Sequence, residues 1–203
     1  MLAKKLSNLI KVYDDLITKE RCEEIIQFFE NHSELHQRVD KNQRPNFTQI
    51  NLTEYIQSDN SSEDEKNIHT ELTTLFMNSF SLYQIDNSIT DELPSQWALE
   101  QIRIKRYNKA IDCCDPNALE SADQFAEHVD VGDYNSARRF LAAFIYLNDT
   151  ENTGKTIFPY LDLQITPVPG RIMIFPPMWM FPHAGLPTFT HNKYIIGTYC
   201  HYL

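Results

Sequence analysis

The stretch QFAEHVD, residues 124–130, decides the expected fold, because it ends in a histidine and a carboxylate two positions apart. Successive side chains of a strand point to opposite faces, so His128 and Asp130 would project from the same face. Two such ligands leave a bound metal in need of a third. His183 follows 53 residues after Asp130, at the end of an apolar, strand-like run, and is the candidate for that position.

Two histidines and one carboxylate on one side of a metal are typical of the facial triad of non-heme Fe(II) oxygenases, which leaves the opposite positions open. Lys193 comes ten residues after His183, where a buried cation could hold the far carboxylate of a 2-oxo acid. The alternative for His128 and Asp130 is a surface-loop pair with a chance spacing. The ordered set of HxD, distant histidine and lysine favours the metal site.

Composition indicates one folded domain, residues 1–203. A hydrophobic content of 42% and an aromatic content of 12% argue against disorder and supply a sizeable core. The net charge of −10 disfavours nucleic acid as a partner, because backbone binding needs clustered lysine and arginine. We identify no signal peptide and no apolar run near the ~18 residues that span a bilayer, so we expect a cytoplasmic protein without a membrane partner.

Residues 1–96 are expected to be mainly helical support. Thr18 is a good N-cap, and polar residues 59–64 form a loop that leads into a second helix. A strand is expected at residues 48–52. The apolar residues at helical spacing are Cys22, Ile25, Ile26 and Phe29 in the first helix, and Leu72, Leu75, Phe76 and Phe80 in the second.

Residues 97–203 are expected to form a β-core that carries the site. The run FLAAFIYL, residues 140–147, is continuously apolar, as a strand buried on both faces should be. Helices followed by short strands indicate an α+β protein with a helix-flanked antiparallel barrel or sandwich. The other expected strands are residues 99–107, 156–158, 161–166, 171–175 and 193–202.

The last of these strands bears on the chemistry. Lys193 and Tyr199 would share a face, with Gly197 between them leaving space. A lysine inside a barrel is costly unless it meets a negative charge, and a bound dicarboxylate would supply one. The alternative is an edge strand with Lys193 in water.

Cys22, Cys113, Cys114 and Cys200 contain no CxxC spacing, so we expect free thiols and no zinc site.

On these residues the chain resembles 2-oxoglutarate- and Fe(II)-dependent dioxygenases of the prolyl 4-hydroxylase type. The resemblance covers most of the chain and is strongest over residues 99–202. Its matching stretches are IKRY (104–107), QFAEHVD (124–130), AFIYLN (143–148), GKTIFP (154–159), PGR (169–171) with Phe175, PHAG (182–185) and KYIIGT (193–198).

This resemblance implies a double-stranded β-helix (jelly-roll) core with N-terminal flanking helices. It implies Fe(II), 2-oxoglutarate as cosubstrate, O₂, and ascorbate as a supporting reductant. By the resemblance, His128, Asp130 and His183 bind the catalytic metal, Lys193 and Tyr107 bind the far carboxylate of 2-oxoglutarate, Thr156 lines the same pocket, and Tyr199 is the large aromatic residue near the cosubstrate.

The implied reaction is hydroxylation of a C–H bond, with a peptidyl proline as the leading substrate. Two alternatives remain: a hydroxylase of a free amino acid or small metabolite, and a jelly-roll protein that binds without turnover. Residues 108–123 form a longer segment than such enzymes usually carry there, and they contain no glycine. This longer segment lies near where a peptide would enter. It therefore affects the inference about the substrate more than the inference about the iron site.

Candidate substrate residues are Arg138, Arg139 and Trp179. The two arginines could clamp a carboxylate or a peptide backbone, or simply be solvated at the start of a strand. Trp179 could form part of an apolar substrate wall, or belong to the core. His191 and His201 are rival metal ligands, but neither is followed ten positions later by lysine or arginine.

Overall fold

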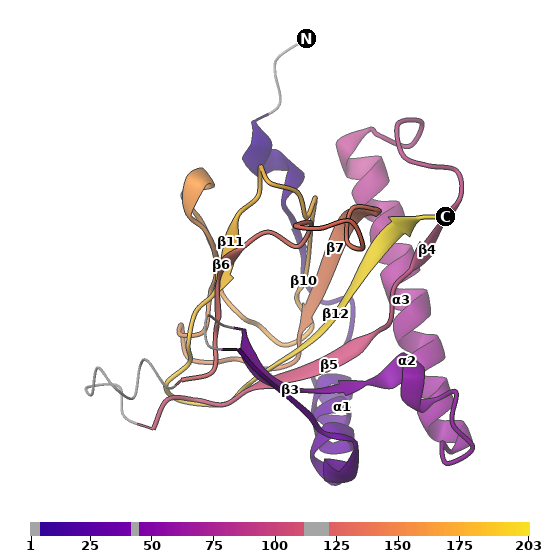
Figure 1. Cartoon of the computed structure of the whole chain (residues 1–203), viewed down its shortest axis with the longest axis vertical. Coiled ribbons are helices and arrows are strands. Elements are labelled where there is room, and N and C mark those ends of the chain that lie inside the picture. The colour runs from indigo at the N-terminus through magenta and orange to yellow at the C-terminus, as the bar shows by residue number, and fades with distance from the viewer. Residues whose placement is uncertain (1–4, 42–44, 112–121) are drawn as a thin grey trace.

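A computed structural model of the chain describes residues 5–41, 45–111 and 122–203 (Figure 1). Two antiparallel sheets face one another, and the helices lie on the outer side of the larger sheet. The α-helices in the described part are α1 (Lys19–Asn31), α2 (Leu52–Tyr55) and α3 (Glu63–Asn87), and the short 3-10 helices are η1 (Leu6–Leu9), η2 (Ser33–Leu35) and η3 (Pro159–Leu161).

The larger sheet has the strand order β1-β10-β7-β12-β5-β3-β2, and β4 also pairs with β12. Its strands are β1 (Lys11–Tyr13), β2 (Gln37–Asp40), β3 (Asn46–Asn51), β4 (Trp97–Leu99), β5 (Arg103–Tyr107), β7 (Arg139–Tyr146), β10 (Ile172–Phe175) and β12 (Lys193–Tyr202).

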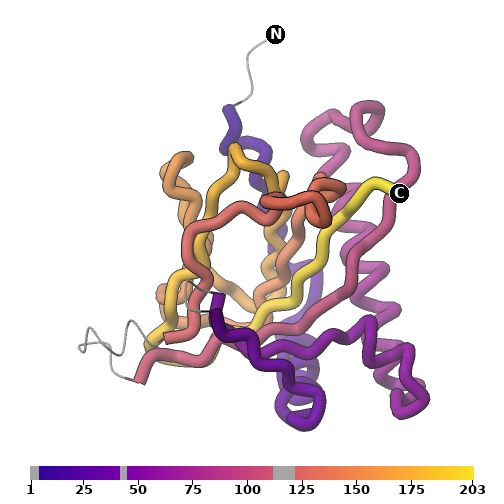
Figure 2. The backbone as a smooth tube through the Cα atoms, in the orientation of Figure 1, coloured from indigo at the N-terminus to yellow at the C-terminus, as the bar shows by residue number. Residues whose placement is uncertain are grey.

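The smaller sheet has the order β6-β11-β8-β9, and its strands are β6 (Phe125–His128), β8 (Thr156–Phe158), β9 (Leu163–Ile165) and β11 (His183–Gly185). The backbone winds back and forth between the two sheets, as Figure 2 shows. This arrangement is the double-stranded β-helix with flanking helices that the sequence predicts.

Strand β7 shows how the sheet separates two cores. Leu141, Ala143 and Ile145 belong to the cluster formed with the helices, whereas Ala142 and Tyr146 belong to the cluster between the sheets. Side chains alternate along a strand, so a strand packed on both faces must be apolar throughout. The continuous apolar run at residues 140–147 is therefore explained, and the face toward the smaller sheet is the face that carries the site.

The two long helices begin where their capping residues predict. The side chain of Thr18 accepts a hydrogen bond from the backbone N–H of Arg21, and Ser62 forms a capping box with Glu65. No helix in the described ranges is both long and apolar enough to cross a membrane.

Residues 1–96 are less purely helical than expected, because they also give β1, β2 and β3 to the larger sheet. Strands β1 and β2 have three and four residues and are partly polar, so they carry no periodic signal in the sequence. Cys22 and Cys200 are buried free thiols. The expectations for Cys113 and Cys114, and for most of the 108–123 segment, fall outside the described residues.

Candidate metal and cosubstrate site

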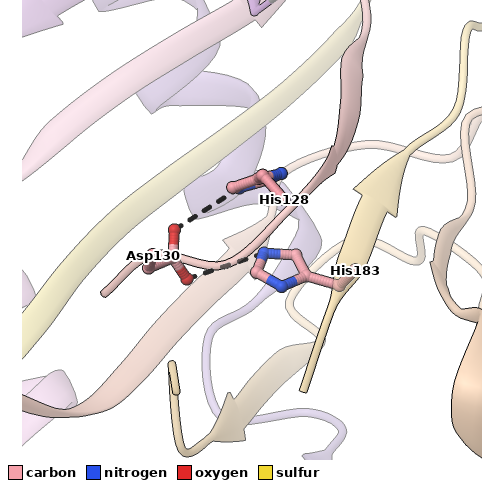
Figure 3. Close-up of side chains that lie close together, drawn as sticks. All are labelled: His128, Asp130 and His183. Carbon is pink, nitrogen blue, oxygen red and sulfur yellow. Dashed lines mark ion pairs between the residues drawn. The ribbon is translucent and has the colours of Figure 1, made fainter. Parts of the chain in front are cut away.

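Three of the predicted ligands converge at one end of the space between the sheets. Ligand atoms of His128, Asp130 and His183 all lie within 4.8 Å of one another (Figure 3). His128 on β6 is the direct cross-strand partner of His183 on β11. The local structure differs from expectation in two details: β6 ends at His128, so a bend presents Asp130, and His183 opens a strand instead of ending one.

Backbone carbonyls fix the orientation of both imidazoles. Nδ1 of His128 lies 2.8 Å from the carbonyl oxygen of Ala126, and Nδ1 of His183 lies 3.1 Å from that of Phe181. A carbonyl can only accept, so each Nδ1 carries the proton and each Nε2 presents a lone pair. Phe125 stacks on His128 with a centroid distance of 3.5 Å and further fixes that ring.

The carboxylate of Asp130 is held between the two histidines and Tyr199. Its Oδ1 accepts a 2.8 Å hydrogen bond from the Tyr199 hydroxyl. Burial acts to raise the pKa of Asp130, but His128, His183 and the Tyr199 hydrogen bond act against it, and the resulting pKa lies below the ordinary value. Burial lowers the pKa of His183, with the Asp130 carboxylate opposing it. The site therefore favours an ionised aspartate and a neutral His183, the forms that bind a metal.

Two atoms of this group have no hydrogen-bond partner. Nε2 of His128 and Oδ2 of Asp130 are buried and make no hydrogen bond. Such atoms cost free energy unless a ligand satisfies them, and both lie within 4.8 Å of the ligand atom of His183. Two imidazole nitrogens and one carboxylate oxygen on one side of a metal are the donor set of Fe(II) oxygenases, so the residues fit that ion.

Lys193 lies on the central strand β12 and is only 2% exposed, which excludes the solvated edge-strand alternative. Its Nζ donates to the carbonyl oxygens of Gly154 (2.9 Å) and Leu186 (3.3 Å) and lies 4.7 Å from the ring centroid of Tyr107. No carboxylate among the described residues pairs with it. Burial lowers its pKa from 10.5 to about 7. This ammonium lacks the negative charge that a buried cation requires.

A pocket connects Lys193 to the two histidines. Tyr107, Thr156 and Tyr199 line it, and the Tyr146 hydroxyl donates a 2.7 Å hydrogen bond to Thr156. The complete lining is Lys105, Tyr107, Phe125, His128, Phe144, Tyr146, Thr156, His183, Gly185, Lys193, Ile195 and Tyr199.

The prediction of pocket residues missed Tyr146 and Lys105. Tyr146 lies within an apolar run and resembles any other core residue in the sequence. Lys105 had a usable signal, since strand alternation places it on the same face as Tyr107.

The three candidate substrate residues differ in exposure and in partners. Arg139 does not offer a free charge, because Nε and Nη2 pair with Glu100 over 2.7 and 2.8 Å and Nη1 donates to the carbonyl oxygen of Asp130. It also lies over the ring of Tyr199, 4.0 Å from the centroid, so its visible role is to support the metal site. Arg138 is exposed and lines an adjoining cleft of about 640 Å³. Trp179 is 75% exposed and therefore not a core residue.

Neither rival histidine joins the metal group in the described part of the chain. His191 is exposed and pairs with Glu151, and Nδ1 of His201 lies 3.8 Å from Oε1 of Glu100. Their side chains thus have partners elsewhere, which agrees with the choice of His183.

The sequence is similar to a known family of enzymes and to one viral protein. The family model for the 2OG-Fe(II) oxygenase superfamily matches residues 116–201. A protein of Acanthamoeba polyphaga mimivirus, described provisionally as a prolyl 4-hydroxylase, is 29% identical over 198 residues, which cover 91% of this chain and 70% of the relative.

Solved structures share the fold at lower identity. The viral collagen prolyl hydroxylase of Paramecium bursaria Chlorella virus-1, solved with 2-oxoglutarate, matches with a TM-score of 0.64 and 18% identity over 96% of this chain and 97% of that one. A Trichoplax adhaerens prolyl hydroxylase, solved with a peptide of hypoxia inducible factor, matches with a TM-score of 0.69 and 13% identity, covering 96% and 84%. The solved structures share the fold, and the family match together with the metal-competent group supports a 2OG-Fe(II) oxygenase of the prolyl 4-hydroxylase type.

Proposed function

We propose that the chain hydroxylates a proline residue of a peptide or protein, with Fe(II) held by His128, Asp130 and His183. The observation that carries the proposal is the convergence of the three ligand atoms, two of which are buried without a partner. The same pocket reaches Lys193, a buried cation without a carboxylate partner. The metal and the far carboxylate of the cosubstrate would thus lie at the two ends of one pocket.

The bound iron would supply the oxygen chemistry that couples decarboxylation of 2-oxoglutarate to hydroxylation of a C–H bond. The protein's part is to hold the ligands. Carbonyl acceptors at Nδ1 keep His128 and His183 in the tautomer that leaves Nε2 free. Tyr199 occupies one oxygen of Asp130 and leaves the other for the metal. Such outer contacts typically set metal affinity.

At the opposite end, Lys193 would pair with the far carboxylate of 2-oxoglutarate. A carboxylate there would restore the lysine's ordinary charged form, which burial alone disfavours. Tyr107 packs its ring against the ammonium, and Thr156 lies on the same wall of the pocket. Phe144 and Phe158 flank His183 and keep the metal end apolar. The pocket therefore orients the cosubstrate while excluding bulk water.

A peptide substrate is supported by the surface next to Asp130. The adjoining cleft of about 640 Å³ includes Asp130 itself and the exposed residues Gly132, Asp133, Asn135 and Arg138. An open cleft accommodates a chain that continues on both sides of the reacting residue, whereas an enclosed pocket would suit a small metabolite. The peptide in the Trichoplax adhaerens neighbour agrees with this choice. Ascorbate would serve to return the iron to Fe(II).

The test is anaerobic addition of Fe(II) and 2-oxoglutarate to metal-free protein, followed by air and a proline-containing peptide. We expect a visible charge-transfer band that requires both additions, is lost in Lys193→Ala, and precedes succinate formation and gain of one oxygen on proline. Hydroxylation of free proline or another small metabolite, with peptides unchanged, would overturn the substrate proposal. A folded, iron-loaded protein that forms no succinate would be a binding protein.

A further inference from the structure

Lys105 is a second lysine of the cosubstrate pocket. Its side chain lines the same pocket as Lys193, His128 and His183. Its Nζ lies 4.9 Å from the ring centroid of Phe47, and no carboxylate within salt-bridge distance pairs with it in the described part of the chain. A lysine seldom lines a pocket without a charged partner, so the buried Lys193 and the partly buried Lys105 in one pocket require an explanation.

Strand register fixes the relation between the two lysines. Lys193 on β12 is directly opposite Tyr107 on β5, and Ile195 is directly opposite Lys105. Side chains two residues apart share a face and are displaced by roughly 7 Å along the strand. The two lysine side chains therefore start from the same wall of the pocket, one strand repeat apart, with Lys105 displaced toward the Tyr199 end of β12.

The charges around Lys105 identify its end of the pocket. Burial lowers its pKa to about 8, and the Asp130 carboxylate opposes that shift, while Arg103 adds to it. The ammonium of Lys105 in turn acts to lower the pKa of His183. For Lys193, burial is the cause of the lowered pKa, without a contribution from the metal group. Lys105 therefore faces the metal end and Lys193 the far end.

We propose that Lys105 is a second cosubstrate-binding residue, which pairs with the carboxylate next to the keto group of 2-oxoglutarate while Lys193 pairs with the far carboxylate. This inference rests on the proposed function. Two cationic side chains on one wall of the pocket complement the two carboxylates of a dicarboxylate. One oxygen of the carboxylate beside the keto group can accept a hydrogen bond, but no residue of the metal group can donate it. Lys105 supplies that donor.

The test measures equilibrium binding to Mn(II)-loaded protein, without turnover. The probes are 2-oxoglutarate and 2-oxopentanoate, which has the same carbon chain and keto-acid end but no far carboxylate. Lys105→Met should weaken both probes by about 10- to 100-fold, as loss of a charged hydrogen bond does. Lys193→Met should weaken 2-oxoglutarate by a similar factor and leave 2-oxopentanoate unchanged. Lys105→Arg should restore part of the binding.

Lys66→Met is the matched control, since Lys66 is exposed on α3 and its loss changes the net charge equally. Should Lys105→Met fail to fold, Lys105→Gln replaces it. The inference is overturned if Lys105 variants bind both probes like the wild type, or if their loss of probe binding follows a loss of Mn(II) affinity. Failure of the wild-type protein to bind Mn(II) or 2-oxoglutarate would instead overturn the proposed function.

Discussion

The Tyr199 hydroxyl donates a 2.8 Å hydrogen bond to Oδ1 of Asp130, while Oδ2 of that carboxylate is buried without a hydrogen-bond partner. The tyrosine is itself covered by the Arg139 guanidinium, which pairs with Glu100. One oxygen of Asp130 is thus hydrogen-bonded to Tyr199, and the other is available to bind a metal. The carboxylate orientation is set before any metal binds.

Replacing Tyr199 by phenylalanine should therefore weaken metal binding without unfolding the protein. Loss of such a contact to a metal ligand typically lowers affinity by about 10- to 100-fold. Mn(II) titration of the purified variant measures the effect. Tyr160→Phe is the control, because Tyr160 is 73% exposed. Equal Mn(II) affinity of Tyr199→Phe and wild type would show that Asp130 needs no such support.

His183→Ala should remove both metal binding and succinate formation, since two remaining ligands do not form a facial triad. His191→Ala is the matched control: His191 is exposed and lies outside the metal group. The measurement is 2-oxoglutarate-dependent succinate release with added Fe(II). Near-normal release by His183→Ala would contradict the ligand assignment, as would inactivity of His191→Ala.

The order of HxD, histidine and lysine in the sequence was enough to predict which side chains would meet. Their local presentation was not predictable, because a bend after β6, not the strand itself, turns Asp130 toward the histidines. The ion pair of Arg139 could not be predicted from the sequence either. Sequence gives its charge, but the Glu100 carboxylate that neutralises it lies 39 residues earlier in the chain and reaches it only through the fold.

Cosubstrate binding to the Mn(II)-loaded protein should take up protons above neutral pH. Lys193 has a pKa of about 7 in the free protein, so at about pH 8 it is largely neutral. A carboxylate partner favours the ammonium form and must draw a proton from solution. We expect clear proton uptake near pH 8, little near pH 6, and affinity that falls as pH rises through 7.

Calorimetry in buffers of different ionisation enthalpy measures this uptake. Lys193→Met should lose most of it, whereas Lys66→Met should retain it. Proton uptake that is the same near pH 6 and pH 8 would contradict a lowered pKa of Lys193.

Metal-free Lys193→Met should be more stable than the wild type at low and neutral pH. The folded-state pKa of about 7 lies below the ordinary 10.5, so between these values the unfolded chain binds more protons. Wild-type stability therefore rises with pH in this window, and the advantage of the variant shrinks by about 1–3 kcal/mol between pH 6 and pH 9. Urea unfolding of both proteins checks this. A constant difference would argue against a buried charge.

Gly170→Ala should destabilise the fold while leaving the site chemistry intact. Gly170 has φ of +78°, and an added Cβ would lie 2.3 Å from the backbone oxygen of Ile17. Strain at such a position, with a backbone clash, should cost about 2–4 kcal/mol. Gly132→Ala is the control, since a Cβ there meets nothing within 4 Å. Equal denaturation midpoints for the two variants would contradict this assignment.

The alternation of side chains along a strand predicts some of the pocket residues but not others. Alternation along β5 already places Lys105 on the same face as Tyr107, so its position in the pocket was predictable. Tyr146 could not be singled out, because every neighbour in its run is apolar. Its distinction from those neighbours is a partner, Thr156, on the opposite sheet.

Strand β12 carries Lys193 at one end and Tyr199 six residues later, both directed into the pocket. A single-residue insertion between them would turn one of the two to the helix-covered face, so the spacing from cosubstrate to metal cannot drift by small steps. The preceding loop, residues 176–182, has no strand register to keep, but its Pro177 carbonyl accepts hydrogen bonds from the backbone N–H groups of Asp130 and Val131. The length of β12 should therefore stay constant among proteins that share this pair of pocket residues.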